Sequence, residues 1–312
     1  MNRTRWKTAG ALALVLVLTV SVAACGKSKK SSSNTTTTKV SGPTIRIAAQ
    51  DFSEDKTLVE VYGQYLKAKG FTVDIQNAIG ARNLAYNALE GNKLDMIIDY
   101  AGSATTALDA TKTGSSNPAT TAATFSGLLA QHGLVAMTYS AAEDQNALVA
   151  LKTYATAHNL VNISDLSKVG SVTLGGLPEC ATRADCLKGY TDPAKYGLKM
   201  TFHQEGYGPP MVTALQSNEI QVAQYQTTAP EIAAGTIVAL KDDKALFSSD
   251  NITPVLRKVV ADAYGAKLAS AINALSAKLT TADLAAFNKS TDIDKQDPAD
   301  VAKTWLKDNG LI

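Results

Sequence analysis

The sequence has few of the residues that build metal sites and nucleophilic catalytic sites. Its 312 residues include three cysteines and three histidines, and His132, His158 and His203 are scattered along the chain. It contains neither the H-E-x-x-H motif of zinc peptidases nor the G-x-S-x-G motif of α/β-hydrolases. These absences argue against a hydrolase and predict no metal or other cofactor. Glycoside cleavage by a pair of carboxylates has no such motif, so it stays an alternative.

A basic surface is also missing from the part of the chain that can fold. The whole chain has 30 basic and 28 acidic residues, and seven of the basic ones fall in the first 43 positions, so 23 basic residues face 28 acidic ones in the remainder. No arginine run interleaved with aromatic residues is present. The mildly acidic body therefore predicts no nucleic-acid partner.

The N-terminus has the pattern of an export signal. Basic residues precede an apolar core at residues 10–22, and Val22-Ala23-Ala24-Cys25 follows. This predicts a signal peptide at residues 1–24, and its end resembles a bacterial lipobox in which Cys25 is acylated. An uncleaved membrane anchor is disfavoured because the apolar core is shorter than the roughly 20 residues a span needs. Ordinary cleavage, with Cys25 incidental, is the other alternative.

The segment after Cys25 is small, polar and lysine-bearing. Residues 25–43 therefore predict a flexible tether, and three early lysines, Lys27, Lys29 and Lys30, would be attracted to an anionic bilayer surface. We expect a monomer that is lipid-anchored on the extracytoplasmic face of the cell membrane. In such an oxidising compartment Cys180 and Cys186 are expected to form a disulfide around Arg183. A metal site is the alternative, but it lacks partner residues.

Residues 76–103 carry the clearest local pattern. Gly80 and Arg82 open a helix, and the apolar run Leu94–Ile98 predicts a strand buried on both faces. That strand ends in Asp99-Tyr100-Ala101-Gly102-Ser103. Because strand ends in open parallel sheets face the ligand crevice, Tyr100 and Ser103 are the first site candidates.

A fainter copy of this unit lies downstream. Residues 214–218 precede an apolar run at 220–223, and superposing Asn92 on Asn218 puts Tyr100 opposite Gln226. The copy predicts two α/β lobes, each presenting a strand end to one cleft. A one-residue shift would bring Tyr225 to the cleft instead of Gln226.

The remaining periodicities complete an α/β fold. Strands are expected at 44–49, 71–75, 135–139, 147–151, 171–174, 199–202 and 255–260, and helices between Ser53 and Gly70 and at 105–108, 122–132, 164–166, 211–217, 264–278, 281–288 and 298–308. The expected helix caps are Ser53, Thr280 in a capping box with Asp283, and Asp297. Lobes at 44–144 plus 252–312 and at 145–251 would require two crossover segments.

Four segments together resemble the substrate-binding lipoproteins of ABC importers for quaternary-amine osmoprotectants. They are Gln50-Asp51-Phe52-Ser53-Glu54, Tyr86-Asn87-Ala88-Leu89 with Leu94-Asp95, Asp99–Ser103 against a family Glu-Tyr-Thr-Gly-Thr, and Pro298–Leu311 against a closing A-x-x-W-L-x-x-x-G-L helix. The resemblance runs from about residue 44 to the C-terminus. It implies a two-lobed, type II periplasmic-binding-protein fold, solute capture by hinge closure, and delivery to a membrane permease.

The resemblance also implies roles for individual residues. Tyr100 matches a tyrosine that boxes the trimethylammonium group through cation–π contacts, and Arg183 matches an arginine that holds the carboxylate of betaine. Asp144 matches an acidic residue at the lobe boundary, and Ser103 keeps a family hydroxyl. The other positions depart from the family pattern: Asn146, Gln226 and Asp250 stand where tyrosines are found, and Gln50 replaces a lysine.

Three of these residues also have a purely structural interpretation. Tyr100 could pack in a core, Arg183 could pair with Asp185, and Asp144 could brace a crossover. Arg82 works against the helix dipole, which indicates either a cross-lobe ion pair or an ordinary exposed cation. The amide side chains would suit another small polar or zwitterionic solute, and a surface sensor lipoprotein of the same fold is a further alternative.

Overall fold

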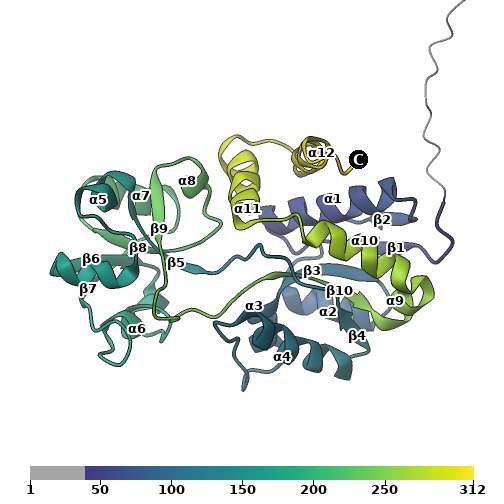
Figure 1. Cartoon of the computed structure of the whole chain (residues 1–312), viewed down its shortest axis with the longest axis horizontal. Helices are drawn as coiled ribbons and strands as arrows, with labels where there is room; N and C mark the ends of the chain where they lie inside the picture. The colour runs from purple at the N-terminus through teal and green to yellow at the C-terminus, as the bar shows by residue number, and fades with distance from the viewer. Residues whose placement is uncertain (1–38) are drawn as a thin grey trace, which may run out of the picture. The chain divides into compact units, whose positions relative to one another are not determined.

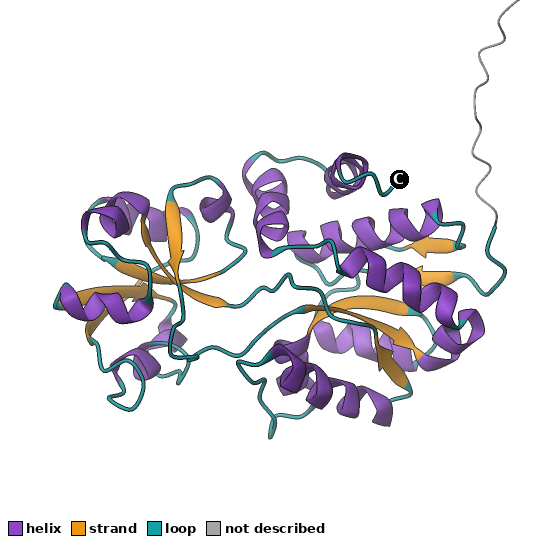
Figure 2. Cartoon of the chain, in the orientation of Figure 1, coloured by secondary structure: helices purple, strands orange, loops and turns teal. Residues whose placement is uncertain are grey.

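The structure is a computed structural model that describes residues 39–312, and these residues form two five-stranded sheets with flanking helices (Figures 1 and 2). The predicted signal peptide, Cys25 and most of the predicted tether lie outside the described residues. Within residues 39–312, no helix is long and apolar enough to cross a membrane.

The first sheet has the strand order β2-β1-β3-β10-β4. Its strands are β1 (Ile45–Ile47), β2 (Val73–Ile75), β3 (Met96–Tyr100), β4 (Leu134–Ala136) and β10 (Ile252–Arg257). Its helices are α1 (Ser53–Ala68), α2 (Arg82–Glu90), α3 (Ala101–Leu108), α4 (Pro118–Gln131), α9 (Lys258–Tyr264), α10 (Ala266–Ser276), α11 (Thr281–Asn288), the π-helix η3 (Lys289–Ile293) and α12 (Pro298–Asp308).

The second sheet has the order β7-β6-β8-β5-β9. Its strands are β5 (Asn146–Leu151), β6 (Ser171–Gly176), β7 (Lys199–Gln204), β8 (Val222–Gln226) and β9 (Ile237–Leu240). Its helices are α5 (Lys152–Ala157), α6 (Leu187–Thr191), α7 (Pro209–Gln216) and α8 (Pro230–Ala233), with 3₁₀ turns η1 (Ile163–Lys168) and η2 (Pro178–Ala181). We refer below to the elements around each sheet as the first half and the second half.

Each sheet is buried on both faces, which explains why the central strands are apolar without alternation. In β3, Met96 and Ile98 join one core cluster together with α1 and α10, whereas Ile97 joins a second cluster with α2 and α4. All five residues of β3 are buried. The second sheet likewise has two clusters, one on each face.

Two chain segments link the halves, as the two-crossover prediction requires (Figure 2). One leads from β4 to β5 and the other from β9 to β10. The segments pair with each other through an isolated antiparallel bridge between Glu143 and Asn251 and a hydrogen bond from the Asp144 amide to the Asp250 carbonyl. Strands β1–β4 and β10 therefore lie on one side of these links, and strands β5–β9 lie on the other. The exact lobe boundaries, at 144/145 and 251/252, stay a prediction.

The structure confirms most predicted elements and corrects others. The capping box of Thr280 with Asp283 and the Asp297 cap are present as predicted. The helix expected at 264–278 is confirmed as α10, and Gly265 at φ 58° separates it from α9, which was not predicted. Strand β10 ends at Arg257 rather than at residue 260, and α5, α6, α8 and β9 were not predicted. At α1 the capping residue is Phe52 rather than Ser53.

Candidate functional site

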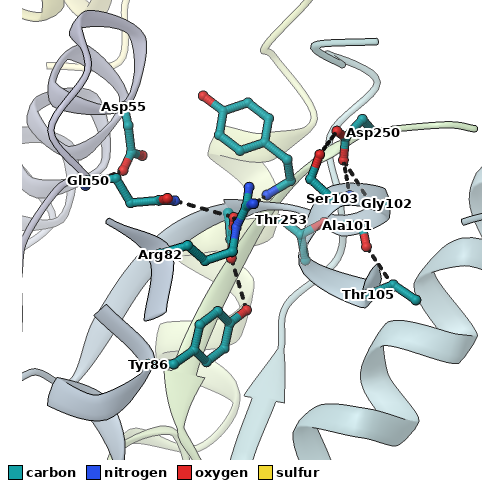
Figure 3. A network of polar contacts seen from close by, with 12 residues as sticks. Gln50, Asp55, Arg82, Tyr86, Ala101, Gly102, Ser103, Thr105, Asp250 and Thr253 are labelled. Atoms are coloured by element: carbon teal, nitrogen blue, oxygen red, sulfur yellow. Dashed lines mark hydrogen bonds and ion pairs between the residues drawn. The ribbon is translucent and has the colours of Figure 1, made fainter. Parts of the chain in front are cut away.

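The end of β3 is fixed by a buried carboxylate. The Asp99 side chain is fully buried and accepts hydrogen bonds from Arg82 Nε at 2.9 Å and Tyr86 Oη at 2.9 Å, with Gln50 Nε2 at 3.4 Å (Figure 3). Arg82 therefore pairs inside the first half, and both earlier interpretations, a cross-lobe ion pair and an exposed cation, are wrong. Gln50 is buried against Asp99 and does not line the cavity described below.

Tyr100, the next residue, connects β3 to the start of α1. Its hydroxyl donates to Glu54 Oε1 at 2.7 Å, and its ring lies 5.9 Å from the Phe52 ring. Only 3% of Tyr100 is exposed, whereas Phe52 is 39% exposed. Burial raises the pKa of the Glu54 carboxyl, although hydrogen bonds from Tyr100 and Asn288 oppose the increase. Tyr100 thus belongs to a core and also lines the cavity.

Asp250 covers the start of α3. Its Oδ1 accepts from the backbone amides of Gly102 at 2.8 Å and Ser103 at 2.9 Å, and its Oδ2 accepts from the Ser103 hydroxyl (Figure 3). A carboxylate at a helix N-terminus is stabilised by the orphan amides and the helix dipole. Burial nevertheless raises the pKa of Asp250 to about 6. The hydroxyl predicted to meet a solute is therefore bound to Asp250.

At the end of β8, Gln226 rather than Tyr225 lines the cavity. Tyr225 is buried, and its hydroxyl donates to the Gly208 carbonyl at 3.0 Å. Tyr207 lies over it with ring centroids 4.7 Å apart and donates to Gln226 Oε1 at 3.2 Å. Tyr207 is 43% exposed and lines the cavity. Sequence reasoning did not identify Tyr207; the available signal was a tyrosine between two glycines in the turn before a helix.

The predicted carboxylate-binding arginine already has a carboxylate partner. Arg183 Nε and Nη2 donate to Asp185 Oδ1 and Oδ2 at 2.8 and 2.6 Å, and Asn146 Nδ2 donates to Asp185 Oδ2 at 3.0 Å. The structural alternative for Arg183 is therefore present, while Arg183 and Asn146 still line the cavity. Cys180 and Cys186 form the predicted disulfide around this loop, with Cα atoms 5.3 Å apart.

Asp144 lies on the first linking segment and also lines the cavity. Its Oδ1 accepts from Thr228 Oγ1 at 2.7 Å. Burial is the main cause that holds the pKa of Asp144 well above its usual value, and the nearby charge of Glu54 is the second cause. The neighbouring contact between the halves is made by Asn288, whose Nδ2 donates both to Glu54 Oε2 at 2.6 Å and to the Thr228 carbonyl at 2.9 Å.

These side chains surround one cavity of about 610 Å³ that both halves line. Six of the seven predicted solute-contacting residues line it, all except Gln50: Tyr100, Ser103, Asp144, Asn146, Arg183 and Gln226. The structure therefore brings them together, and whether they contact a solute stays a prediction. Within residues 39–312, no group of three or more His, Cys, Asp or Glu side chains is arranged to hold a metal ion.

The cavity is acidic and partly aromatic. Four carboxylates line it, those of Glu54, Asp144, Asp250 and Asp292, and its two arginines each pair with a carboxylate that does not line it. Burial disfavours the charged form of an acid. A bound cation would therefore stabilise the charged form of the carboxylates whose pKa is raised by burial. The exposed rings of Phe52 and Tyr207 could contact the apolar surface of that cation.

The comparisons with known proteins agree with this arrangement. The family model described as the substrate binding domain of an ABC-type glycine betaine transport system matches residues 43–308. A glycine-betaine-binding protein of Pseudomonas aeruginosa is 28% identical over 289 residues, which is 86% of this chain and 89% of that protein.

Two solved structures share the fold. The crystal structure of a glycine betaine/carnitine/choline ABC transporter protein superposes with a TM-score of 0.77 at 22% identity, covering 87% of this chain and 99% of that one. Apo YehZ from Escherichia coli gives a TM-score of 0.77 at 21% identity, covering 87% and 100%. The predicted two-lobed fold is confirmed, and the chain belongs to the family of substrate-binding domains of ABC-type glycine betaine transport systems.

Proposed function

We propose that this chain captures a small quaternary amine of the glycine betaine and choline class between its two halves and delivers it to an ABC permease. One observation carries the proposal: the cavity combines four carboxylates with the exposed aromatic faces of Phe52 and Tyr207. A trimethylammonium group is attracted by both, because it is a cation with an apolar surface. The printed names of the relatives, which include glycine betaine, carnitine and choline, support the same class.

The geometry also supports a closure mechanism. The cavity is lined by residues of both halves, and within residues 39–312 the chain passes from one half to the other through the two paired segments around Asp144 and Asp250. A solute that contacts both halves favours whichever arrangement brings them together, by its difference in affinity for the two arrangements. The chain itself would perform no chemistry.

The N-terminal pattern adds the location. We propose that Cys25 carries the lipid, that residues 25–43 tether a monomeric body, and that the protein stays on the extracytoplasmic face of the membrane. Cells supplied with a labelled fatty acid should label the wild-type protein and leave Cys25→Ser unlabelled. Equal labelling of the two proteins, or no label in either, would contradict acylation at Cys25.

The solute class is tested by a thermal-shift and calorimetry screen of the full chain. Choline, glycine betaine and carnitine should raise the unfolding temperature, because a ligand that binds only the folded state stabilises it. The matched control is 3,3-dimethylbutanol, which has the shape of choline without the charge and should give no shift. An equal shift with the neutral alcohol would exclude a cation site, and a shift only with ectoine-like solutes, polyamines or amino acids would exclude the quaternary-amine class.

A further inference from the structure

Asp185 already holds the donors that a solute carboxylate would need. Two nitrogens of the Arg183 guanidinium and the Asn146 amide converge on its carboxylate, at 2.6 to 3.0 Å. The fork from Arg183 is bidentate, which is the strongest arrangement between a guanidinium and a carboxylate. Two residues expected to bind the solute therefore bind a carboxylate of the chain itself, and the positive charge of Arg183 is compensated.

The loop that carries this pair is short and closed. Arg183 and Asp185 are two residues apart, and the disulfide between Cys180 and Cys186 brackets them. Cys180 and Cys186 are buried in the core of the second half, while the two charged side chains remain 40% and 37% exposed. The chain therefore keeps the acid beside the arginine, and a solute carboxylate would have to compete with a partner at very high local concentration.

The rest of the cavity offers no other free cation among the described residues. Arg82 is held by Asp99, and the remaining charged residues that line the cavity are the four carboxylates already named. A zwitterion would bring its own carboxylate into an acidic space. A solute with the same ammonium group and no carboxylate would meet only attractive charge.

We infer that Asp185 determines specificity: by occupying Arg183 and Asn146, it makes the cavity select a choline-like cation over a glycine-betaine-like zwitterion. The inference rests on the proposed function and narrows its solute class. Choline and glycine betaine are suitable probes because they share the trimethylammonium group and differ in a hydroxymethyl group against a carboxylate.

Calorimetric titration of the full chain with both solutes tests this selection. The wild-type protein should bind choline at least tenfold more tightly than glycine betaine. Asp185→Asn keeps the shape and frees Arg183, so its affinity for glycine betaine should rise about tenfold while its affinity for choline falls. In Arg183→Gln/Asp185→Asn, the gain for glycine betaine should disappear, because no guanidinium is left to receive the carboxylate.

The matched control is Asp262→Asn, which removes one negative charge from an ion pair with Lys258 outside this cavity. Its ratio of choline to betaine affinity should equal that of the wild type. An equal or tighter wild-type affinity for glycine betaine overturns the inference even if Asp185→Asn does not fold. An unchanged ratio in Asp185→Asn, or the same change in Asp262→Asn, also overturns it. Binding of neither solute refutes the proposed function, and the inference with it.

Discussion

The ends of β3 and β8 have the same backbone arrangement but carry different side chains. Each strand lies third in its sheet, follows a helix, and is preceded by an asparagine in the left-handed region, Asn92 at φ 58° and Asn218 at φ 60°. Aligning the two asparagines matches β3 with β8 residue for residue. The chemical difference lies in the last three positions, where Ile98, Asp99 and Tyr100 stand opposite Gln224, Tyr225 and Gln226.

In the first half the inward position is Asp99 and the cavity position is Tyr100; in the second half they are Tyr225 and Gln226. The residue that contacts each strand end from the start of the preceding helix differs as well. Arg82 at the start of α2 reaches Asp99, whereas Tyr207 before α7 lies over Tyr225 and reaches Gln226. The end of β3 therefore offers a polar network with a buried tyrosine, and the end of β8 offers the exposed ring of Tyr207.

The comparison shows that the backbone at a strand end determines the position of a side chain but not the chemical group that this position provides to the cavity. The second aromatic face of the cavity comes from a loop residue, Tyr207, and not from the strand position that the internal copy singled out. Four predictions can break or sharpen this contrast.

The largest effect is expected at the inward positions. Asp99→Ala leaves Arg82 without its partner in a partly buried site and should lower the free energy of unfolding by about 3 kcal/mol. Tyr225→Phe removes one hydrogen bond, to the Gly208 carbonyl, and should cost about 1 kcal/mol. Urea denaturation measures both, and equal losses would contradict a difference between the two strand ends.

The cavity positions should separate binding from stability. Tyr207→Ala should weaken quaternary-amine binding at least tenfold and change the unfolding temperature little, because Tyr207 is 43% exposed. Tyr207→Phe keeps the ring and should bind within about threefold of wild type. Tyr100→Ala should reduce both affinity and stability, because its ring is part of the core of the first half. Calorimetry and thermal unfolding decide; a Tyr207→Ala variant with wild-type affinity would remove Tyr207 from the site.

Acidity should weaken cation binding through Asp250, which lies on the second linking segment. The groups around Asp250 are Ser103, the Gly102 amide, Arg82 and Asp99. Because its pKa is about 6 in the folded chain, Asp250 becomes neutral as the pH falls from 7 to 5, and choline affinity should fall with it. In the empty protein the same elevated pKa makes Asp250 favour folding at low pH, and this contribution is lost as the pH rises through about 6.

The control for this pH effect is Asp250→Asn, which should flatten the part of the affinity profile centred near pH 6. Burial raises the pKa values of Glu54 and Asp144 as well, so some weakening of binding at lower pH should remain in the variant. A variant profile identical to that of the wild type would show that Asp250 does not contribute.

The smallest effect tests the shared backbone. Asn92→Ala and Asn218→Ala should each cost about 1 kcal/mol of unfolding free energy, because alanine is strained at positive φ. The corresponding glycine variants should lie within about 0.5 kcal/mol of wild type, since glycine adopts this region freely. Clearly unequal costs at the two sites would argue that the two units are not equivalent.

Sequence reasoning could recover most of the framework because burial on both faces leaves apolar runs that periodicity detects. The internal copy gave the equivalent positions of β3 and β8, and the capping box gave the start of α11. The edge strand β9 was missed because its four residues, Ile237–Leu240, are too few for a periodic signal. Helix α9 was missed because the apolar run at 255–260 was assigned to a strand, and a short apolar run does not distinguish a strand from a buried helix.

The site was less predictable because its side chains satisfy one another. Ser103 binds Asp250, Asn146 binds Asp185, and Gln50 binds Asp99. A polar side chain chooses between possible partners according to the distances between segments that lie more than 30 residues apart in the chain. The local sequence pattern does not contain these distances. Tyr207 was missed for the same reason, since a turn sequence does not show that its tip returns to the end of β8.

The most direct test of the account is the crystal structure of the protein with bound choline. We expect the trimethylammonium group in the cavity between the halves, within about 6 Å of the Tyr207 ring centroid, and close to carboxylates of the first half such as Glu54. Choline held by one half alone, or bound away from Tyr207 and the carboxylates, would contradict it.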